Sequence, residues 1–176
     1  MRHDIAPIAP FSSRAQALIG RLGLRPHPEG GWYREKFRST SHVIAQDGRP
    51  ARPALTTIYF LLESGQHSRW HRVSSDEVWV HLEGSAIALW DWSAADASGP
   101  ARTVLGPVSD GIEHQHAVAA GRWQAATPLS TTPGDFSLAA CLVGPGFDFA
   151  DFTMMDASGD AAMAIRRDHP DLARFI

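Results

Sequence analysis

Residues 65–84 carry a pattern of alternating polar and apolar positions that predicts two short strands joined by a polar turn at residues 74–76. One face of the first strand, around residues 69–73, holds Arg69, His71 and Val73. The second strand, residues 77–82, places Val78, Val80 and Leu82 on one face and Glu77, Trp79, His81 and Glu83 on the other. The apolar face is expected to pack a sheet. A face that combines a carboxylate, an indole and an imidazole is typical of a cavity wall.

Similar short segments, separated by turn residues, recur along the rest of the chain. They predict strands over residues 32–37, 54–62, 85–92, 103–105 and 112–118, from residue 123 onward, and over 136–143. In the strand over 85–92, Trp90 lies on the face opposite Asp91. A short helix is expected to begin at Ser12 or Ser13 and to end at Gly23. The tail is expected to be helical from residue 158 through 167, with one more turn over 172–176.

Short strands with turn signals about every 8–12 residues predict an all-β, antiparallel sandwich or barrel. The periodicity does not separate an immunoglobulin-like sandwich from a jelly roll. At 176 residues the chain is expected to form a single domain. We divide it into a lead-in and helix (1–23), a barrel (24–152) and a tail (153–176).

The composition is that of an ordinary globular protein, with 44% hydrophobic and 20% charged residues. A net charge of −3 and the lack of a basic run give no electrostatic case for nucleic-acid binding. No stretch approaches the roughly 20 apolar residues of a membrane helix, and no secretory signal is recognisable. The one cysteine, Cys141, cannot form an internal disulfide and is expected to be a packed thiol. These features together favour a cytoplasmic location.

The spacing of Gly65, His71, Glu77 and Gly84 resembles the first motif of the cupin superfamily. In that motif a glycine is followed by two histidines, a glutamate and a closing glycine. Val73 stands at the position of the second histidine. The resemblance implies a double-stranded β-helix, the cupin jelly-roll barrel, with a short N-terminal helix and a helical C-terminal tail.

Three further segments resemble one cupin subgroup, the cupin-5 or DUF985 type. They are residues 28–39, which begin Pro-Glu-Gly-Gly, the run Val118–Ala126, and residues 144–152. In the first of these, two interpretations stay open. The segment forms a structural corner before an edge strand, or Glu29, Trp32 or Arg34 reaches the mouth of a pocket.

The second cupin motif supplies a histidine that completes a metal site, but this chain departs from it. Gln124 stands at the position of that histidine and Ala119 at the position of a proline. A tight metal site needs three or four well-placed ligands, so no cofactor is favoured. If a divalent ion (Zn, Fe, Mn or Ni) is bound, the expected ligands are His71, Glu77, His81 and Gln124. His114 and His116 share one face of a predicted strand and form a second, less favoured pair.

A histidine that faces a carboxylate in an aromatic pocket is an acid–base pair suited to proton abstraction next to a carbonyl. Our first hypothesis is therefore a metal-independent isomerase or epimerase of a small carbohydrate-like or carbonyl compound. His71 is the expected catalytic acid or base, and Glu77 is expected to orient it. The expected ligand-binding residues are Tyr59, Trp79, His81, Gln124, Trp90, Glu29 and Arg34.

Three alternatives stay open. The protein binds a small molecule without turnover, it is a metal-dependent oxygenase or lyase, or His71 and Glu77 only stabilise the barrel. The resemblance also implies a homodimer. The expected partners are a small-molecule ligand and a second copy of the chain, with no nucleic acid and no membrane.

Overall fold

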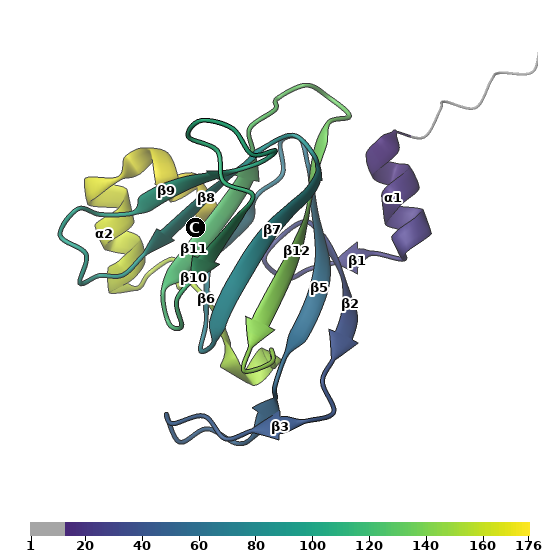
Figure 1. Cartoon of the computed structure of the whole chain (residues 1–176). Helices are drawn as coiled ribbons and strands as arrows, with labels where there is room; N and C mark the ends of the chain where they lie inside the picture. Colours follow the sequence, from purple (N-terminus) through teal and green to yellow (C-terminus); the bar gives the residue numbers. More distant parts are fainter. Residues whose placement is uncertain (1–12) are drawn as a thin grey trace, which may run out of the picture.

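The computed structural model describes residues 13–176 and shows two antiparallel sheets that face each other (Figure 1). The six-stranded sheet contains, in spatial order, β1 (Arg25–Pro26), β2 (Trp32–Arg38), β5 (Thr56–Glu63), β12 (Phe136–Gly144), β7 (Asp76–Gly84) and β10 (Gln115–Val118). The five-stranded sheet contains β13 (Phe152–Met154), β6 (Ser68–Val73), β11 (Trp123–Pro128), β8 (Ile87–Trp92) and β9 (Ala101–Leu105). A separate short pair, β3 (His42–Val43) and β4 (Arg52–Pro53), interrupts the connection from β2 to β5. The mostly β, antiparallel architecture is confirmed, whereas the lead-in expected over residues 1–10 lies outside the described residues.

Helix α1 (Arg14–Leu22) begins and ends as its sequence predicts. The Ser13 side chain accepts a hydrogen bond from the backbone N–H of Gln16 at 3.2 Å. Gly23 ends the helix in the left-handed conformation, with a φ of 62°. The buried Ala15 and Leu18 pack the helix onto the outer face of the six-stranded sheet. This helix therefore covers β5 from outside and leaves the space between the sheets free.

The C-terminal segment covers the outer face of the five-stranded sheet (Figure 1). It consists of α2 (Asp160–Asp168) and the 3₁₀ helix η2 (Pro170–Phe175), close to the expected bounds. A shorter 3₁₀ helix, η1 (Phe149–Asp151), precedes β13. Phe175 and Ile165 are almost fully buried against Trp70 of β6. None of the helices in residues 13–176 has the length and apolar character that crossing a bilayer requires.

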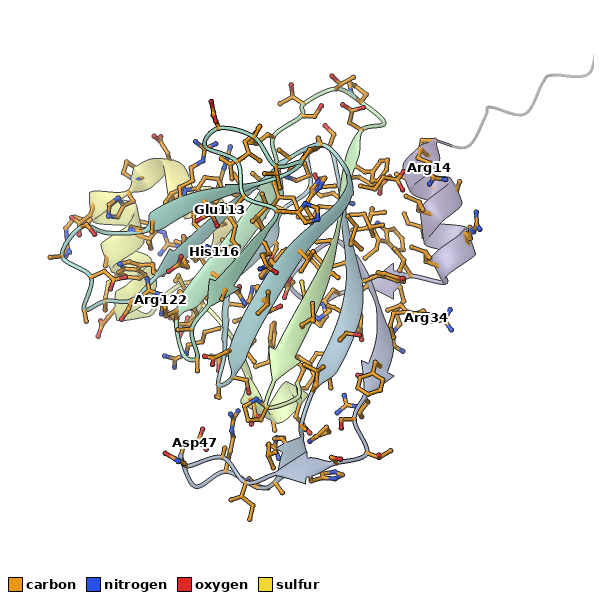
Figure 2. The ribbon with its side chains drawn as sticks, viewed as in Figure 1. Arg14, Arg34, Asp47, Glu113, His116 and Arg122 are labelled. Atoms are coloured by element: carbon orange, nitrogen blue, oxygen red, sulfur yellow. The ribbon has the colours of Figure 1, made fainter. Side chains whose placement is uncertain are left out.

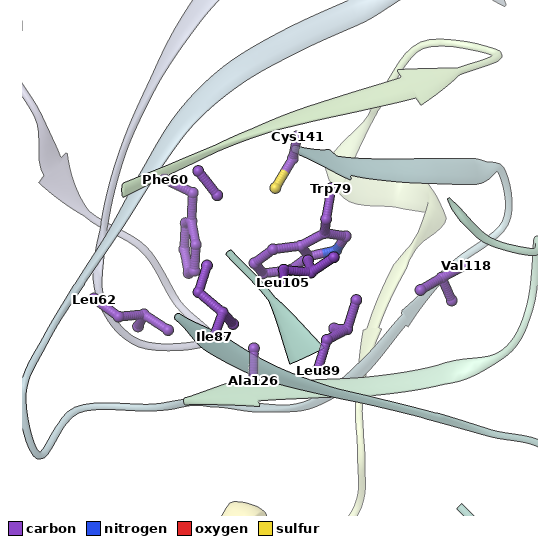
Figure 3. Close-up of a cluster of buried hydrophobic side chains, with 10 residues drawn as sticks. Phe60, Leu62, Trp79, Ile87, Leu89, Leu105, Val118, Ala126 and Cys141 are labelled. Atoms are coloured by element: carbon purple, nitrogen blue, oxygen red, sulfur yellow. The ribbon is translucent and has the colours of Figure 1, made fainter. Parts of the chain in front are cut away.

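The main core lies between the two sheets and fills one part of that space (Figure 3). Phe60 and Trp79 of the six-stranded sheet meet Ile87, Leu89 and other side chains of the five-stranded sheet. The members of this core are Phe60, Leu62, Trp79, Ile87, Leu89, Leu105, Val118, Ala126, Ala139 and Cys141. The inner face of β7 is thus the face that carries Trp79.

The apolar face of β7, expected to pack the sheet, lies instead on the outside. Val78 and Val80 are half-buried there, and Leu82 is 44% exposed. A bulge between β7 and β12 then changes the register before Glu83. Glu83 therefore leaves the inner face and pairs with Arg14 of α1 at 2.7 Å.

Residues 74 and 75 carry the chain from one sheet to the other, because β6 and β7 belong to different sheets. This crossover places His71 and Glu77 on opposite walls of the interior. A bulge in β6 also breaks the expected alternation. On β11 Gln124 lies opposite His71 and Ala126 opposite Ser68, so β6 has one extra residue. Arg69 is exposed in consequence, and the predicted face shared by Arg69 and His71 is wrong.

Two glycines with positive φ allow the loop between β1 and β2 to pack closely against β5 and the start of β6. Gly30 has a φ of 116° and Gly31 a φ of 68°. A Cβ atom at Gly30 would collide with the carbonyl oxygen of His67, and one at Gly31 would lie 2.7 Å from the carbonyl oxygen of Leu61. The backbone N–H of Arg69 donates to the carbonyl of Glu29 at 2.9 Å, which ties the loop to β6. This close approach brings the Glu29 side chain into the interior.

We expect Gly30→Ala to lower the free energy of unfolding by about 3 kcal/mol, because the methyl group meets backbone and the positive φ is strained. Gly65→Ala is the matched control. It also has a positive φ, of 83°, but no atom lies within 4 Å of its Cβ position, so a loss of only about 1 kcal/mol is expected. Urea denaturation of both variants measures the difference, and equal losses would show that the loop is not packed as described.

Candidate functional site

A cavity of about 360 Å³ occupies the part of the interior that the main core leaves open. Its wall comes from β1, β2 and the loop between them, from β5, β6, β7 and β12, and from the segment 147–152. The polar and charged lining residues are Arg25, His27, Glu29, Tyr33, Glu35, Arg38, Thr56, His71, Glu77, Cys141 and Asp148. The apolar ones are Ile58, Phe60, Val73, Val143, Phe147, Phe149 and Phe152. A few polar groups among aromatic walls are typical of a small-molecule site.

A buried carboxylate bound by two histidines lies in this wall. Oε2 of Glu29 is 3.3 Å from Nδ1 of His27 and 3.2 Å from Nε2 of His71. The hydroxyl of Ser68 donates to Oε1 of Glu29 at 2.9 Å. Glu29 is only 5% exposed and His71 only 2%. The carboxylate and the two imidazoles therefore interact away from bulk water.

The surroundings of Glu29 favour its ionised form. Burial alone would raise the pKa of the Glu29 carboxyl. That effect is opposed by the positive charge on His71, by the hydrogen bond and charge of His27, and by the hydrogen bond from Ser68. The net result is a lowered pKa of the Glu29 carboxyl. Glu29 is thus a carboxylate that the site holds as an anion.

The ring of His71 is oriented by its backbone neighbour. Nδ1 lies 2.8 Å from the carbonyl oxygen of Arg69, which can only accept, so we assign a proton to Nδ1. Nε2 then faces the Glu29 carboxylate, and a hydrogen bond between these two atoms requires a second proton. His71 and Glu29 therefore form a unit that can hold or release one proton at the cavity wall.

Glu77 lies on the opposite wall and has different partners. The indole N–H of Trp79 donates to Oε1 of Gln124 at 3.0 Å, and Nε2 of Gln124 donates to Oε2 of Glu77 at 2.6 Å. Because an indole N–H can only donate, Trp79 fixes the orientation of the Gln124 amide. With Oε2 of Glu77 engaged as an acceptor, the proton of the neutral acid belongs on Oε1.

Burial raises the pKa of Glu77, and the negative charge of Glu29 adds to this shift. Positive charge on His71 and the hydrogen bonds from Gln124 and Cys141 offset it only in part. Burial also raises the pKa of the Cys141 thiol well above its ordinary value. The cavity thus contains one carboxyl group biased toward the anion and another biased toward the neutral acid, an arrangement that separates acid and base roles.

The structure brings His71 and Glu77 to one cavity, and of the two interpretations left open for the segment of Glu29 it favours the one in which that side chain reaches a pocket. The predicted pairing differs, however. The direct carboxylate partner of His71 is Glu29, and Glu77 is bound by Gln124. Gln124 lies behind Glu77 and orients it. Val73, at the position of the second cupin histidine, contributes an apolar side chain to the wall.

Trp79 and His81 point into the interior but do not line the cavity. Trp79 is 1% exposed and packs edge-on against Phe60, with ring centroids 5.5 Å apart. His81 is 3% exposed, and its Nε2 lies 3.2 Å from the carbonyl oxygen of Ser85. Trp79 belongs to the main core and His81 is held by a backbone carbonyl, so the prediction that these two side chains line the ligand cavity is wrong.

Tyr59, Trp90 and Arg34 lie outside the interior, so their predicted ligand-binding role in this cavity is also wrong. Lys36 lies over the ring of Tyr59 on the outer face of the six-stranded sheet, 5.7 Å from its centroid. Trp90 packs against Phe175 of η2, with ring centroids 5.1 Å apart. Arg34 donates to the carbonyl oxygen of the last residue of α1 at 3.0 Å (Figure 2). Trp32, the third candidate of its segment, donates its indole N–H to a glutamate of β5.

The residues at the predicted metal positions do not converge on one point. Gln124 is held by Trp79 and Glu77, and His81 by a backbone carbonyl. His114 and His116 bind different partners, the carbonyl oxygen of a glycine and Asp91 respectively. Within residues 13–176 no group of three or more His, Cys, Asp or Glu side chains has a geometry that could hold a metal ion. The donor set therefore does not fit a metal of the kind that the resemblance implies.

His27 is the main site residue that was not among the residues expected from the sequence. Its ring packs edge-on against Tyr33, with centroids 4.5 Å apart, and contacts Phe60 and Phe152. The chain turns at residues 27–30, where the backbone N–H of Gly30 donates to the carbonyl oxygen of His27 at 3.0 Å, and this turn brings the two side chains together. The sequence signal for the turn was Pro28 followed by two glycines.

Comparison with known proteins identifies relatives over most of the chain. Residues 16–155 match the model of the family described as Cupin superfamily (DUF985), which confirms the family expected from the motifs. No curated protein matches the chain. A hypothetical protein from Leishmania major is 31% identical, with a TM-score of 0.75 over 92% of this chain and 96% of the other. A protein from Shewanella oneidensis is 30% identical, with a TM-score of 0.73 over 90% and 91% of the two chains.

A more distant structure shares only the fold. A cupin 2 domain-containing protein from Halorhodospira halophila is 17% identical, with a TM-score of 0.51 over 87% of this chain and 94% of the other.

The two buried glutamates predict opposite pH effects on stability. The folded protein binds the Glu77 proton more tightly than the unfolded chain does, because the Glu77 pKa is raised above 4.5. Wild type should therefore lose stability relative to Glu77→Gln as the pH rises from 4.5 through the folded-state pKa. For Glu29 the pKa is lowered, so wild type should lose stability relative to Glu29→Gln as the pH falls below 4.5. Urea denaturation over a series of pH values measures both trends, and trends of the same sign would contradict the assignment.

Proposed function

Because the chain belongs to the Cupin superfamily (DUF985) family and its cavity holds an acid and a base on opposite walls, we propose that it transfers protons next to a carbonyl group without a metal. The activity is that of an isomerase or epimerase acting on a small carbohydrate-like or carbonyl compound. The observation that carries this proposal is the contact of His71 Nε2 with Glu29 Oε2 at 3.2 Å, in the same cavity as Glu77.

The base is the unit of His71 and Glu29. In the form that has released its second proton, the unit accepts at Nε2 of His71 the proton from the carbon atom beside the substrate carbonyl. The electron pair of the broken C–H bond forms the carbon–carbon double bond of the enol, and the carbonyl π pair moves to the oxygen. Positioned acid and base groups each contribute typically about 10²–10⁴-fold to the rate of such a step. Because Nδ1 of His71 is held by the Arg69 carbonyl, the ring keeps its orientation while the proton moves.

The acid is Glu77 in its neutral form. Oε1 donates its proton to the carbonyl oxygen as negative charge develops there, which gives an enol. In an isomerisation, His71 returns its proton to the former carbonyl carbon, and Glu77 recovers a proton from the hydroxyl of the carbon that becomes the new carbonyl. In an epimerisation, Glu77 recovers its proton from the enol hydroxyl, water supplies a proton to the opposite face of the original carbon, and His71 releases its proton to water.

The apolar part of the wall supports this chemistry. Phe60, Ile58, Val143 and Phe152 are among the apolar side chains of the wall. Exclusion of water strengthens the electrostatic interactions inside the site. A volume of about 360 Å³ lies at the lower end of the range for ligand pockets, which favours a small molecule.

Deuterium exchange tests the proposal. In D₂O, wild type should exchange the hydrogens beside the carbonyl of at least one compound in a panel of small ketones and hydroxyketones, followed by proton NMR. His71→Asn and Glu77→Gln should each slow that exchange by about 100-fold or more, because each removes one proton-transfer group.

His116→Asn is the matched control, since His116 also lies near a carboxylate, Asp91 at 3.4 Å, but outside the cavity (Figure 2). Its exchange rate should equal that of wild type. Exchange of no compound in the panel, or unchanged exchange in a folded His71→Asn variant, would contradict the proposal.

A second candidate function is binding without turnover. It is favoured by the complete satisfaction of Glu29, whose two oxygens are already bound by Ser68, His27 and His71. Under this alternative the network only fixes the shape of the cavity. A ligand that raises the melting temperature and is recovered chemically unchanged, with no exchanged hydrogens, would favour it.

A further inference from the structure

Four exposed charged side chains line the cavity, and three of them, Glu35, Arg38 and Asp148, interact with one another. Glu35 receives hydrogen bonds from Nε and Nη2 of Arg38 at 3.0 and 2.6 Å. Asp148 accepts the backbone N–H of Ala150 at 2.9 Å, and its charge also acts on Arg38. The fourth, Arg25, has no such counter-charge.

Arg25 is nevertheless held in position. It lies opposite Tyr33 in the register of β1 and β2, and its guanidinium carbon is 5.0 Å from the centroid of the Tyr33 ring. Within residues 13–176 the Arg25 side chain forms no hydrogen bond and no ion pair. Its guanidinium N–H donors therefore remain available to a ligand, while the aromatic ring limits where the group can go.

A continuous row of contacts leads from Arg25 to the buried acid–base groups. Tyr33 touches the ring of His27, with centroids 4.5 Å apart, and Nδ1 of His27 lies 3.3 Å from Oε2 of Glu29. All four residues line the same cavity. A ligand that reaches Glu29 and His71 thus passes along the wall that carries Arg25.

We propose that Arg25 binds an anionic group of the substrate, a carboxylate or a phosphate, while the carbonyl end of the same molecule lies between His71 and Glu77. This inference rests on the proposed function and adds the class of substrate to it. Both anions match the planar donor fork of an arginine.

The charge distribution also fixes the direction in which such a molecule enters. The inner part of the cavity holds Glu29, which is biased toward its anionic form, so a second anion there would be buried beside a like charge. The outer part offers the unpaired guanidinium of Arg25 next to solvent. The anionic group therefore stays at the mouth, and the uncharged carbonyl end reaches the acid–base groups.

Binding of two matched pairs of compounds tests this inference. Levulinate is compared with its methyl ester, and dihydroxyacetone phosphate with dihydroxyacetone, by isothermal titration calorimetry. In wild type at least one anion should bind about tenfold or more tightly than its uncharged partner, as expected for one charge-assisted contact. The pair that shows the preference tells whether the anion is a carboxylate or a phosphate.

The preference should disappear in Arg25→Gln and persist in Arg72→Gln. Arg72 is the matched control because its guanidinium also lies over an aromatic ring, that of Trp123 at 4.7 Å, but outside the cavity. Both arginines are exposed, and melting followed by circular dichroism verifies that both variants fold.

The inference is overturned if neither anion binds wild type more tightly than its uncharged partner. It is also overturned if the preference for the anion persists in Arg25→Gln. Because binding is measured without turnover, the result is independent of proton exchange. A preserved anion preference in a protein that exchanges no hydrogens would remove the proposed function and leave the anion site in place.

Discussion

A carboxylate inside a protein is stable only when it is paired, and the pairing of Glu29 is the constraint on which the rest of the site depends. Ser68, His27 and His71 supply that pairing. The loop of Gly30 brings the carboxylate inside, because its backbone can approach β6 only without a side chain. The bulge in β6 turns His71 inward to meet it. Two local irregularities of the backbone thus serve one buried charge.

The same buried charge influences the opposite wall. Negative charge on Glu29 adds to burial in raising the pKa of Glu77, while the network of Trp79 and Gln124 fixes where its proton sits. Because β6 and β7 belong to different sheets, His71 and Glu77 face each other across the interior. The fold therefore offers a space between a proton acceptor and a proton donor, which is what a reaction beside a carbonyl group requires.

Much of the fold and part of the site follow from the sequence. Alternation and turn residues predicted most strands, and the spacing of the first motif placed His71 and Glu77 in one cavity. Alternation along a strand says which side chains point inward, but not which part of the interior is filled. For this reason Trp79 and His81, on the same face as Glu77, were expected in the cavity and are packed in the core instead. The contact of His71 with Glu29 depends on a tertiary approach of the loop to β6, and no local pattern reveals such a contact.

One cavity holds two buried glutamates whose pKa values are shifted in opposite directions. Carbon-13 NMR titration of the side-chain carboxyl groups tests this arrangement, with the signals assigned from Glu29→Gln and Glu77→Gln. We expect Glu77 to titrate above the ordinary glutamate pKa of 4.5 and Glu29 to titrate below it. The reverse order, or a common titration of both groups near 4.5, would contradict it.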